Sequence, residues 1–112
     1  MISKNLSIGT ANFGMRYGYK KLRSISVKKI REILKYARKV NISSIDTAYN
    51  YGYAEEKLGE IGVKDWNISS KFPSTSSNSL IDIDNHITKK LTESLIRLRV
   101  NKIENFFIHN RQ

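Results

Sequence analysis

The run Asp46-Thr47-Ala48-Tyr49-Asn50-Tyr51-Gly52 decides how this chain is read. A short apolar stretch precedes it, so Asp46 lies where a strand is expected to give way to a loop. Lys71 and His109 each follow another short apolar stretch and occupy the same kind of position. Four polar residues therefore stand at the ends of predicted strands or in the loops that follow them: Asp46, Tyr51, Lys71 and His109.

The hydrophobic period of the sequence alternates between strand-like and helix-like. Ser26 can cap the first long helix, and Asn41 suits the left-handed residue that ends it. Acidic residues in the first turn favour a short helix from Glu55. The predicted strands are Leu6–Thr10, Ile42–Ala48, Trp66–Lys71 and Ile103–Ile108. The predicted helices are Val27–Val40, Glu55–Ile61 and Asp82–Leu98, with loops at Asn12–Lys21, Tyr49–Tyr53 and Phe72–Ser79.

The resulting order is βαβαβαβ, which predicts an α/β fold with a parallel sheet and right-handed crossovers. With 112 residues, the chain is long enough for a single domain, residues 1–112, with a modest core. The glycine-containing segment 9–14 lacks the spacing of a dinucleotide-binding fingerprint, and no helix is expected to open there.

Composition excludes several classes of protein. The chain has no cysteine, so it has neither a disulfide framework nor a cysteine-based metal site. No stretch approaches the roughly 18 apolar residues of a membrane span. The first residues lack the apolar segment of a signal peptide. We therefore expect a cytoplasmic protein with no membrane partner and no metal.

The formal net charge of +10 has more than one interpretation. Ten of the twenty basic residues fall between Arg16 and Lys39, where only Glu32 opposes them. A solvated helix face is the favoured interpretation, and a phosphate-bearing ligand is the alternative. Nucleic acid is disfavoured because no recognised binding motif accompanies the charge.

The four strand-end residues are suited to carbonyl reduction. Ligand chemistry in parallel α/β folds collects at the carboxyl ends of the strands. A tyrosine can act as a general acid near neutral pH when a nearby ammonium favours its phenolate form. A carboxylate keeps that ammonium charged and in place, and a histidine can donate a hydrogen bond to the substrate oxygen. Tyr51, Lys71, Asp46 and His109 fit these roles in turn, with the hydride supplied by a cofactor.

Each residue also has a plain structural interpretation. Asp46 could merely cap the next turn. Tyr51 lies in a tyrosine-rich region and could serve in packing. Lys71 is one of many lysines, and His109 could be a structural histidine. The functional interpretation rests on the conjunction of all four residues in a matching topology.

These residues resemble the Asp-Tyr-Lys-His tetrad of the aldo-keto reductases. The segment 9–14 looks like the first-strand motif of that family, and 46–52 looks like its most diagnostic run. Segment 55–59 resembles the glutamate-rich helix start that follows. Segment 70–71 resembles the family's lysine strand, and segment 108–110 resembles its histidine strand. Segment 91–98 resembles the helix that precedes the histidine strand. The resemblance covers nearly the whole chain.

The resemblance implies half of a (β/α)8 barrel and an NADP(H)-dependent oxidoreductase. The substrate would be the carbonyl of an aldehyde, a ketone or a sugar. Gly9, Thr10 and Asp46 would lie near the nicotinamide end of NADPH. Tyr51, His109 and Asn110 would face the substrate.

A (β/α)8 barrel takes roughly 250 residues, so these 112 residues provide about half of one. In the family, loops after the last strands grip the cofactor's phosphates and adenosine. Four parallel strands leave an open edge and an exposed inner face. Three hypotheses follow: an inactive fragment of a longer reductase, a half-barrel that works with a second copy or with a missing C-terminal half, and a non-catalytic module that binds an anionic partner.

Overall fold

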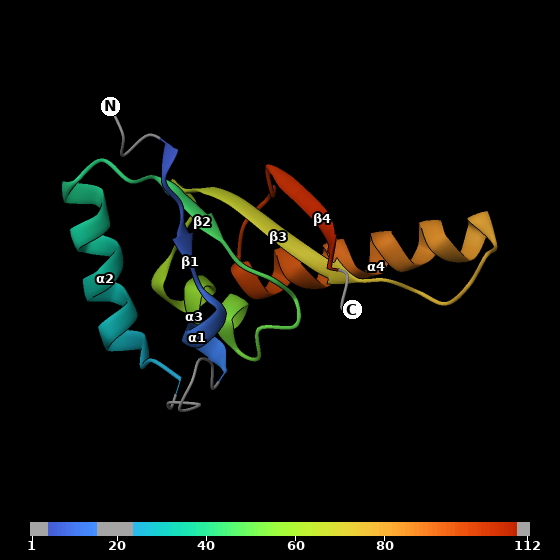
Figure 1. Ribbon diagram of the computed structural model, residues 1–112, viewed down its shortest axis with the longest axis horizontal. Coiled ribbons are helices and arrows are strands. Elements are labelled where there is room, and N and C mark those ends of the chain that lie inside the picture. The colour runs from blue at the N-terminus through green and yellow to red at the C-terminus, as the bar shows by residue number, and fades with distance from the viewer. Residues whose placement is uncertain (1–4, 16–23, 110–112) are drawn as a thin grey trace.

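The computed structural model describes residues 5–15 and 24–109 of the chain. Within them, strands and helices alternate around a four-stranded sheet of order β1-β2-β3-β4 (Figure 1). All three strand pairs are parallel, as the sequence predicts. The elements are β1 (Ile8–Gly9), α1 (Ala11–Gly14), α2 (Val27–Lys39), β2 (Ser44–Asp46), α3 (Ala54–Ile61), β3 (Asn67–Pro73), α4 (Leu80–Leu98) and β4 (Asn105–His109).

One face of the sheet carries the hydrophobic core. Ile45 and Ile68 are neighbours in the parallel register, and both are fully buried beneath the helices. Ile30 of α2, Leu58 of α3 and Leu98 of α4 complete the same cluster. Side chains alternate along each strand, so the residues between these positions face away from the helices. That second face is mostly polar, because the register aligns Asp46, Ser69 and Asn105 on it.

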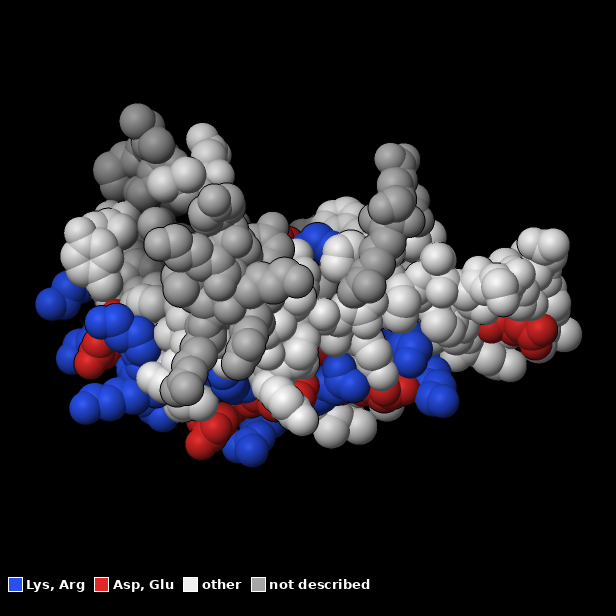
Figure 2. All heavy atoms as spheres, turned by 60° about the horizontal axis from the view of Figure 1, so that its bottom comes forward, with Lys and Arg blue, Asp and Glu red and all other residues white. Residues whose placement is uncertain are grey.

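The ends of α2 follow the predicted signals. The side chain of Ser26 accepts a hydrogen bond from the backbone N–H of Lys29, which confirms the predicted N-terminal cap. Asn41 has a φ of 66°, the left-handed conformation expected directly after the helix. The basic side chains of α2 are exposed, and Figure 2 shows them on the side of the molecule where this helix lies. The prediction of a solvated basic face is confirmed for this helix.

Every predicted strand and helix is wrong by one or two residues at one end or both, and His109 lies within the last strand rather than after it. A one-turn helix, α1, forms within segment 9–14, where no helix was expected to open, because the side chain of Phe13 is 3% exposed and anchors that turn in the core. The third strand continues to Pro73, because Phe72 is buried and stacks on Phe106 at 4.7 Å between ring centroids. The last helix begins at Leu80, where Ser79 provides the cap.

The fourth strand forms an open edge in the described part of the chain. The side chains of Phe107 and Ile108 are 52% and 57% exposed. A groove of about 140 Å³ runs beside Ile108, with Ile83 and Ile87 of α4 in its wall. The expected open edge is therefore confirmed, with Ile108 on the helix side of β4 and Phe107, level with Lys71, on the other face. None of the described helices is long and apolar enough to span a membrane.

The crossing of α3 and α4 leads to a prediction about stability. A Cβ atom at Gly59 would lie 2.0 Å from the backbone oxygen of Arg97, so the two helices would have to separate. We expect Gly59→Ala to lower the free energy of unfolding by about 1–3 kcal/mol, despite the better helix propensity of alanine. Urea denaturation measures this change, with the exposed Glu60→Ala as the matched control. Equal or greater stability in Gly59→Ala would contradict the close approach.

Candidate active site

An ion pair connects the carboxyl ends of two neighbouring strands. Asp46 is the last residue of β2, and Lys71 lies on the adjacent strand β3. The Lys71 Nζ atom lies 2.7 Å from Asp46 Oδ1 and also donates to the backbone oxygen of Thr47 at 3.0 Å. The Lys71 side chain is 20% exposed, so its charge is held mainly by protein oxygens. The ammonium therefore has a fixed position at this end of the sheet.

Tyr51 and His109 lie at the same end of the sheet. The centre of the Tyr51 ring lies 5.4 Å from Lys71 Nζ and 5.8 Å from the centre of the His109 ring. The two rings meet edge to face, with an interplanar angle of 89°. The register pairs His109 of β4 with Pro73 of β3, which brings the histidine close to the lysine strand. The structure thus brings together all four of the predicted tetrad positions.

The loop that carries Tyr51 packs against the first strand's turn. The backbone N–H of Tyr53 donates to the oxygen of Gly14 at 3.2 Å, so the β2–α3 loop lies directly against α1. A Cβ atom at Gly14 would lie 2.1 Å from the oxygen of Tyr51. Gly52 has a φ of +58°, which favours glycine at this turn. Glycine is required on both sides of the contact.

Two buried polar atoms near the tetrad have no hydrogen-bond partner among the described residues. They are Nδ1 of His109 and Oγ1 of Thr47. An unpaired buried polar atom costs about 1–3 kcal/mol, so such atoms are usually satisfied by water or a ligand. His109 Nδ1 is a candidate for contact with a polar ligand atom beside the Tyr51 ring.

The two residues of the first predicted strand that are expected at the cofactor differ in their exposure. A Cβ atom at Gly9 would meet nothing within 4 Å, so the surface above it is open, and Gly9 pairs with Asp46 in the register. Thr10 is fully buried, and both its backbone N–H and its hydroxyl donate to the backbone oxygen of Asp46 at 3.1 Å. Thr10 therefore fixes the backbone of Asp46. Asn110, expected at the substrate, lies outside the described residues.

Comparison with known proteins identifies the family. The model of the aldo/keto reductase family matches residues 5–112. This chain belongs to the aldo/keto reductase family. Two solved aldo-keto reductases of Pseudomonas aeruginosa are similar to it, at 29% and 30% identity and TM-scores of 0.76 and 0.73. Both matches cover 93% of this chain but only 42% and 40% of the other.

A third similar structure is a thermostable aldo-keto reductase solved with the inhibitor epalrestat. It is 25% identical, has a TM-score of 0.68, and is matched over 95% of this chain and 38% of its own. No curated protein matches the sequence significantly. The chain therefore spans less than half the length of these structures and corresponds to the N-terminal part of their barrel.

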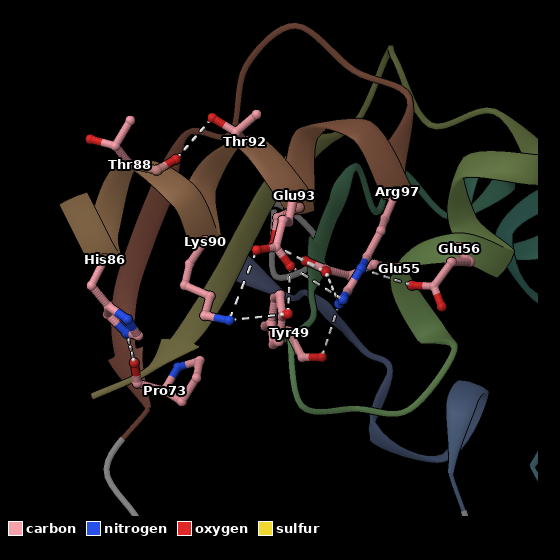
Figure 3. Close-up of polar contacts among 11 residues, drawn as sticks. Tyr49, Glu55, Glu56, Pro73, His86, Thr88, Lys90, Thr92, Glu93 and Arg97 are labelled. Carbon is pink, nitrogen blue, oxygen red and sulfur yellow. Dashed lines mark hydrogen bonds and ion pairs between the residues drawn. The ribbon is translucent and has the colours of Figure 1, made fainter. Parts of the chain in front are cut away.

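Glu55 has a role that the sequence analysis missed. It was expected to be a first-turn acid favoured by the helix dipole, yet it is 1% exposed. Its carboxylate accepts hydrogen bonds from Ser70 at 2.8 Å and Ser94 at 3.1 Å. The guanidinium of Arg97 lies 3.5 Å from the same carboxylate (Figure 3). One carboxylate thus ties α3 to β3 and α4. The sequence contains a signal for it, because Ser70 and Ser94 interrupt otherwise apolar core positions.

The buried carboxylate predicts a pH dependence of stability. Burial raises the pKa of Glu55 above 4.5, against the hydrogen bonds from Ser70 and Ser94 and the charge of Arg97, which lower it. A carboxyl group whose pKa is raised by folding binds its proton more tightly in the folded state than in the unfolded state. Below its unfolded pKa, the protonated group therefore stabilises the folded state. That contribution is lost as the pH rises through the folded pKa.

We therefore expect the stability of Glu55→Gln relative to the natural chain to increase as the pH rises from about 4 toward neutrality. Urea denaturation across that pH range measures the difference, with the exposed Glu60→Gln as control. A Glu55→Gln difference that does not vary with pH would contradict the raised pKa.

Proposed function

We propose that this chain provides the reacting half of an NADPH-dependent carbonyl reductase. Asp46, Tyr51, Lys71 and His109 are its proposed catalytic residues. The observation that carries the proposal is the position of the Lys71 ammonium, 2.7 Å from the Asp46 carboxylate and 5.4 Å from the centre of the Tyr51 ring. Membership of the aldo/keto reductase family supports an oxidoreductase function.

The proposed chemistry assigns one task to each side chain. The bound nicotinamide supplies a hydride for the carbonyl carbon. As that C–H bond forms, the electron pair of the C=O double bond moves to oxygen, and Tyr51 donates its proton there. Lys71 stabilises the phenolate that remains, and Asp46 holds Lys71 in place. His109 Nδ1, when it carries the proton, donates a hydrogen bond that orients the carbonyl oxygen.

The open surface at Gly9 is the proposed place for the nicotinamide ring. Among residues 5–15 and 24–109, no atom lies within 4 Å of a Cβ built at Gly9, and the aligned Asp46 lies on the same face of the sheet. Thr10 acts there by holding the backbone of Asp46. The substrate carbonyl of an aldehyde, a ketone or a sugar would lie against the rings of Tyr51 and His109 where they meet, with Asn110 as a further substrate contact.

We further propose that turnover needs the remaining elements of the barrel. The matched structures are more than twice as long as the part this chain covers. The open edge of β4, with the exposed Ile108 and its neighbouring groove, is where a following strand and helix would pack. By the family resemblance, those later elements would bind the phosphates and adenosine of NADPH.

A chimera tests the proposed acid. Residues 1–112 would replace the matching part of one of the similar Pseudomonas aeruginosa proteins, which completes the barrel. We expect NADPH-dependent reduction of a test aldehyde, and a loss of about 10²- to 10⁴-fold in kcat for Tyr51→Phe. Tyr36→Phe, at a side chain that is 67% exposed, is the matched control. Reduction that survives unchanged in Tyr51→Phe would show that this phenol is not the acid.

A further inference from the structure

A second tyrosine of the same loop, Tyr49, is held by side chains of α4 that contact both its hydroxyl and its ring. Its hydroxyl donates to Glu93 Oε2 at 2.6 Å, and Lys90 Nζ donates to that hydroxyl at 3.2 Å. The Arg97 guanidinium carbon lies 3.9 Å from the ring centre, and Lys90 Nζ lies 4.3 Å from it. Figure 3 shows the ring between these two cations. Cations over an aromatic face are attracted to it, so both contacts hold the ring.

The backbone of Tyr49 is held as firmly as its side chain. Its N–H donates to the backbone oxygen of Lys71 at 2.8 Å, which continues the pairing of β2 with β3 beyond Asp46. Its own backbone oxygen accepts from Arg97 at 3.4 Å. Arg97 is in turn fixed by carboxylates of α3, at 3.5 Å from both Glu55 and Glu56. Tyr49 therefore joins the loop to the strand that carries Lys71 and to the helix pair α3–α4.

Tyr51 is held by contacts of a different kind: its side chain packs against the hydrophobic core, and its backbone oxygen accepts from the N–H of Ala54 at 3.1 Å. Its backbone N–H donates to Ala48 within the loop, and its ring meets Lys71 and His109. One residue, Asn50, separates the anchored Tyr49 from the proposed acid. Because Tyr49 fixes the loop to β3 and α4 just before Tyr51, its position contributes to the placement of the Tyr51 ring.

We propose that Tyr49 is a positioning residue, clamped by Arg97 and Lys90 of α4, which places the Tyr51 ring between Lys71 and His109. This inference rests on the proposed function for its catalytic consequence, but the placement itself can be measured without activity. A misplacement of about 1 Å can cost about 10²-fold in rate, so such a clamp has a direct consequence for reaction.

Nuclear magnetic resonance of the purified chain tests the placement. In the natural chain, we expect nuclear Overhauser contacts from the Tyr51 ring to the Lys71 side chain and to the His109 ring. Tyr49→Ala should abolish these contacts while the methyl signals of Ile45 and Ile68 in the core stay in place. Tyr49→Phe keeps the ring between the two cations and should retain the contacts.

Contacts of Tyr51 that persist in Tyr49→Ala would overturn the proposal, and so would their loss in Tyr36→Ala, the control at an exposed tyrosine. Should Tyr49→Ala unfold the chain, Lys90→Met provides the second test. It removes one cation from the ring and the hydrogen bond to the Tyr49 hydroxyl while Arg97 stays paired with Glu55, and it should shift the Tyr51 contacts in the same direction.

Kinetics of the chimera separate this inference from the proposed function. Tyr49→Ala should lower kcat about tenfold or more with little change in the KM for NADPH, and Tyr49→Phe should restore most of it. If Tyr51→Phe leaves reduction intact, the proposed function fails while the placement result stands. If Tyr51→Phe abolishes reduction and Tyr49→Ala changes neither kcat nor the Tyr51 contacts, the positioning role fails alone.

Discussion

The Lys71–Asp46 ion pair is the interaction on which the candidate site depends. Lys71 holds the loop after β2 in two ways, because its ammonium binds the Asp46 carboxylate and the Thr47 oxygen while its backbone oxygen accepts from Tyr49. The parallel register makes this possible, since it places the carboxyl ends of β2 and β3 side by side. A shift of one residue would turn the Lys71 side chain toward the helices and separate the pair.

A second charged centre supports the site from the helix side of the sheet. Glu55 is buried among Ser70, Ser94 and Arg97, and the same arginine extends to Tyr49 in the loop. A buried carboxylate is tolerated only where hydrogen bonds and an opposite charge replace water. The same side chains therefore join α3 to α4 and join both helices to the loop that carries the proposed acid. This explains how a loop with a glycine turn can carry a residue that must be placed accurately.

Much of the fold and of the tetrad follows from the sequence because both depend on local patterns. The alternating periods predict the parallel sheet, and the strand ends predict that Asp46, Lys71 and His109 meet. The turn at α1 was missed because a single buried ring, Phe13, overrides a loop-like composition. The roles of Glu55 and Tyr49 were missed for a different reason. Glu55 binds Ser70 on β3 as well as Ser94 on α4, and Tyr49 binds Glu93 on α4, so only the packing of α4 against the sheet and α3 brings these partners together.

The central claim is that residues 1–112 carry the reacting end of a reductase site. Fluorescence titration of the purified chain with NADPH tests it most directly. We expect saturable binding that Asp46→Asn weakens and that 2′,5′-ADP does not compete for, because the adenosine end would be bound by later barrel elements. No binding at millimolar NADPH, or binding that 2′,5′-ADP displaces, would contradict the claim.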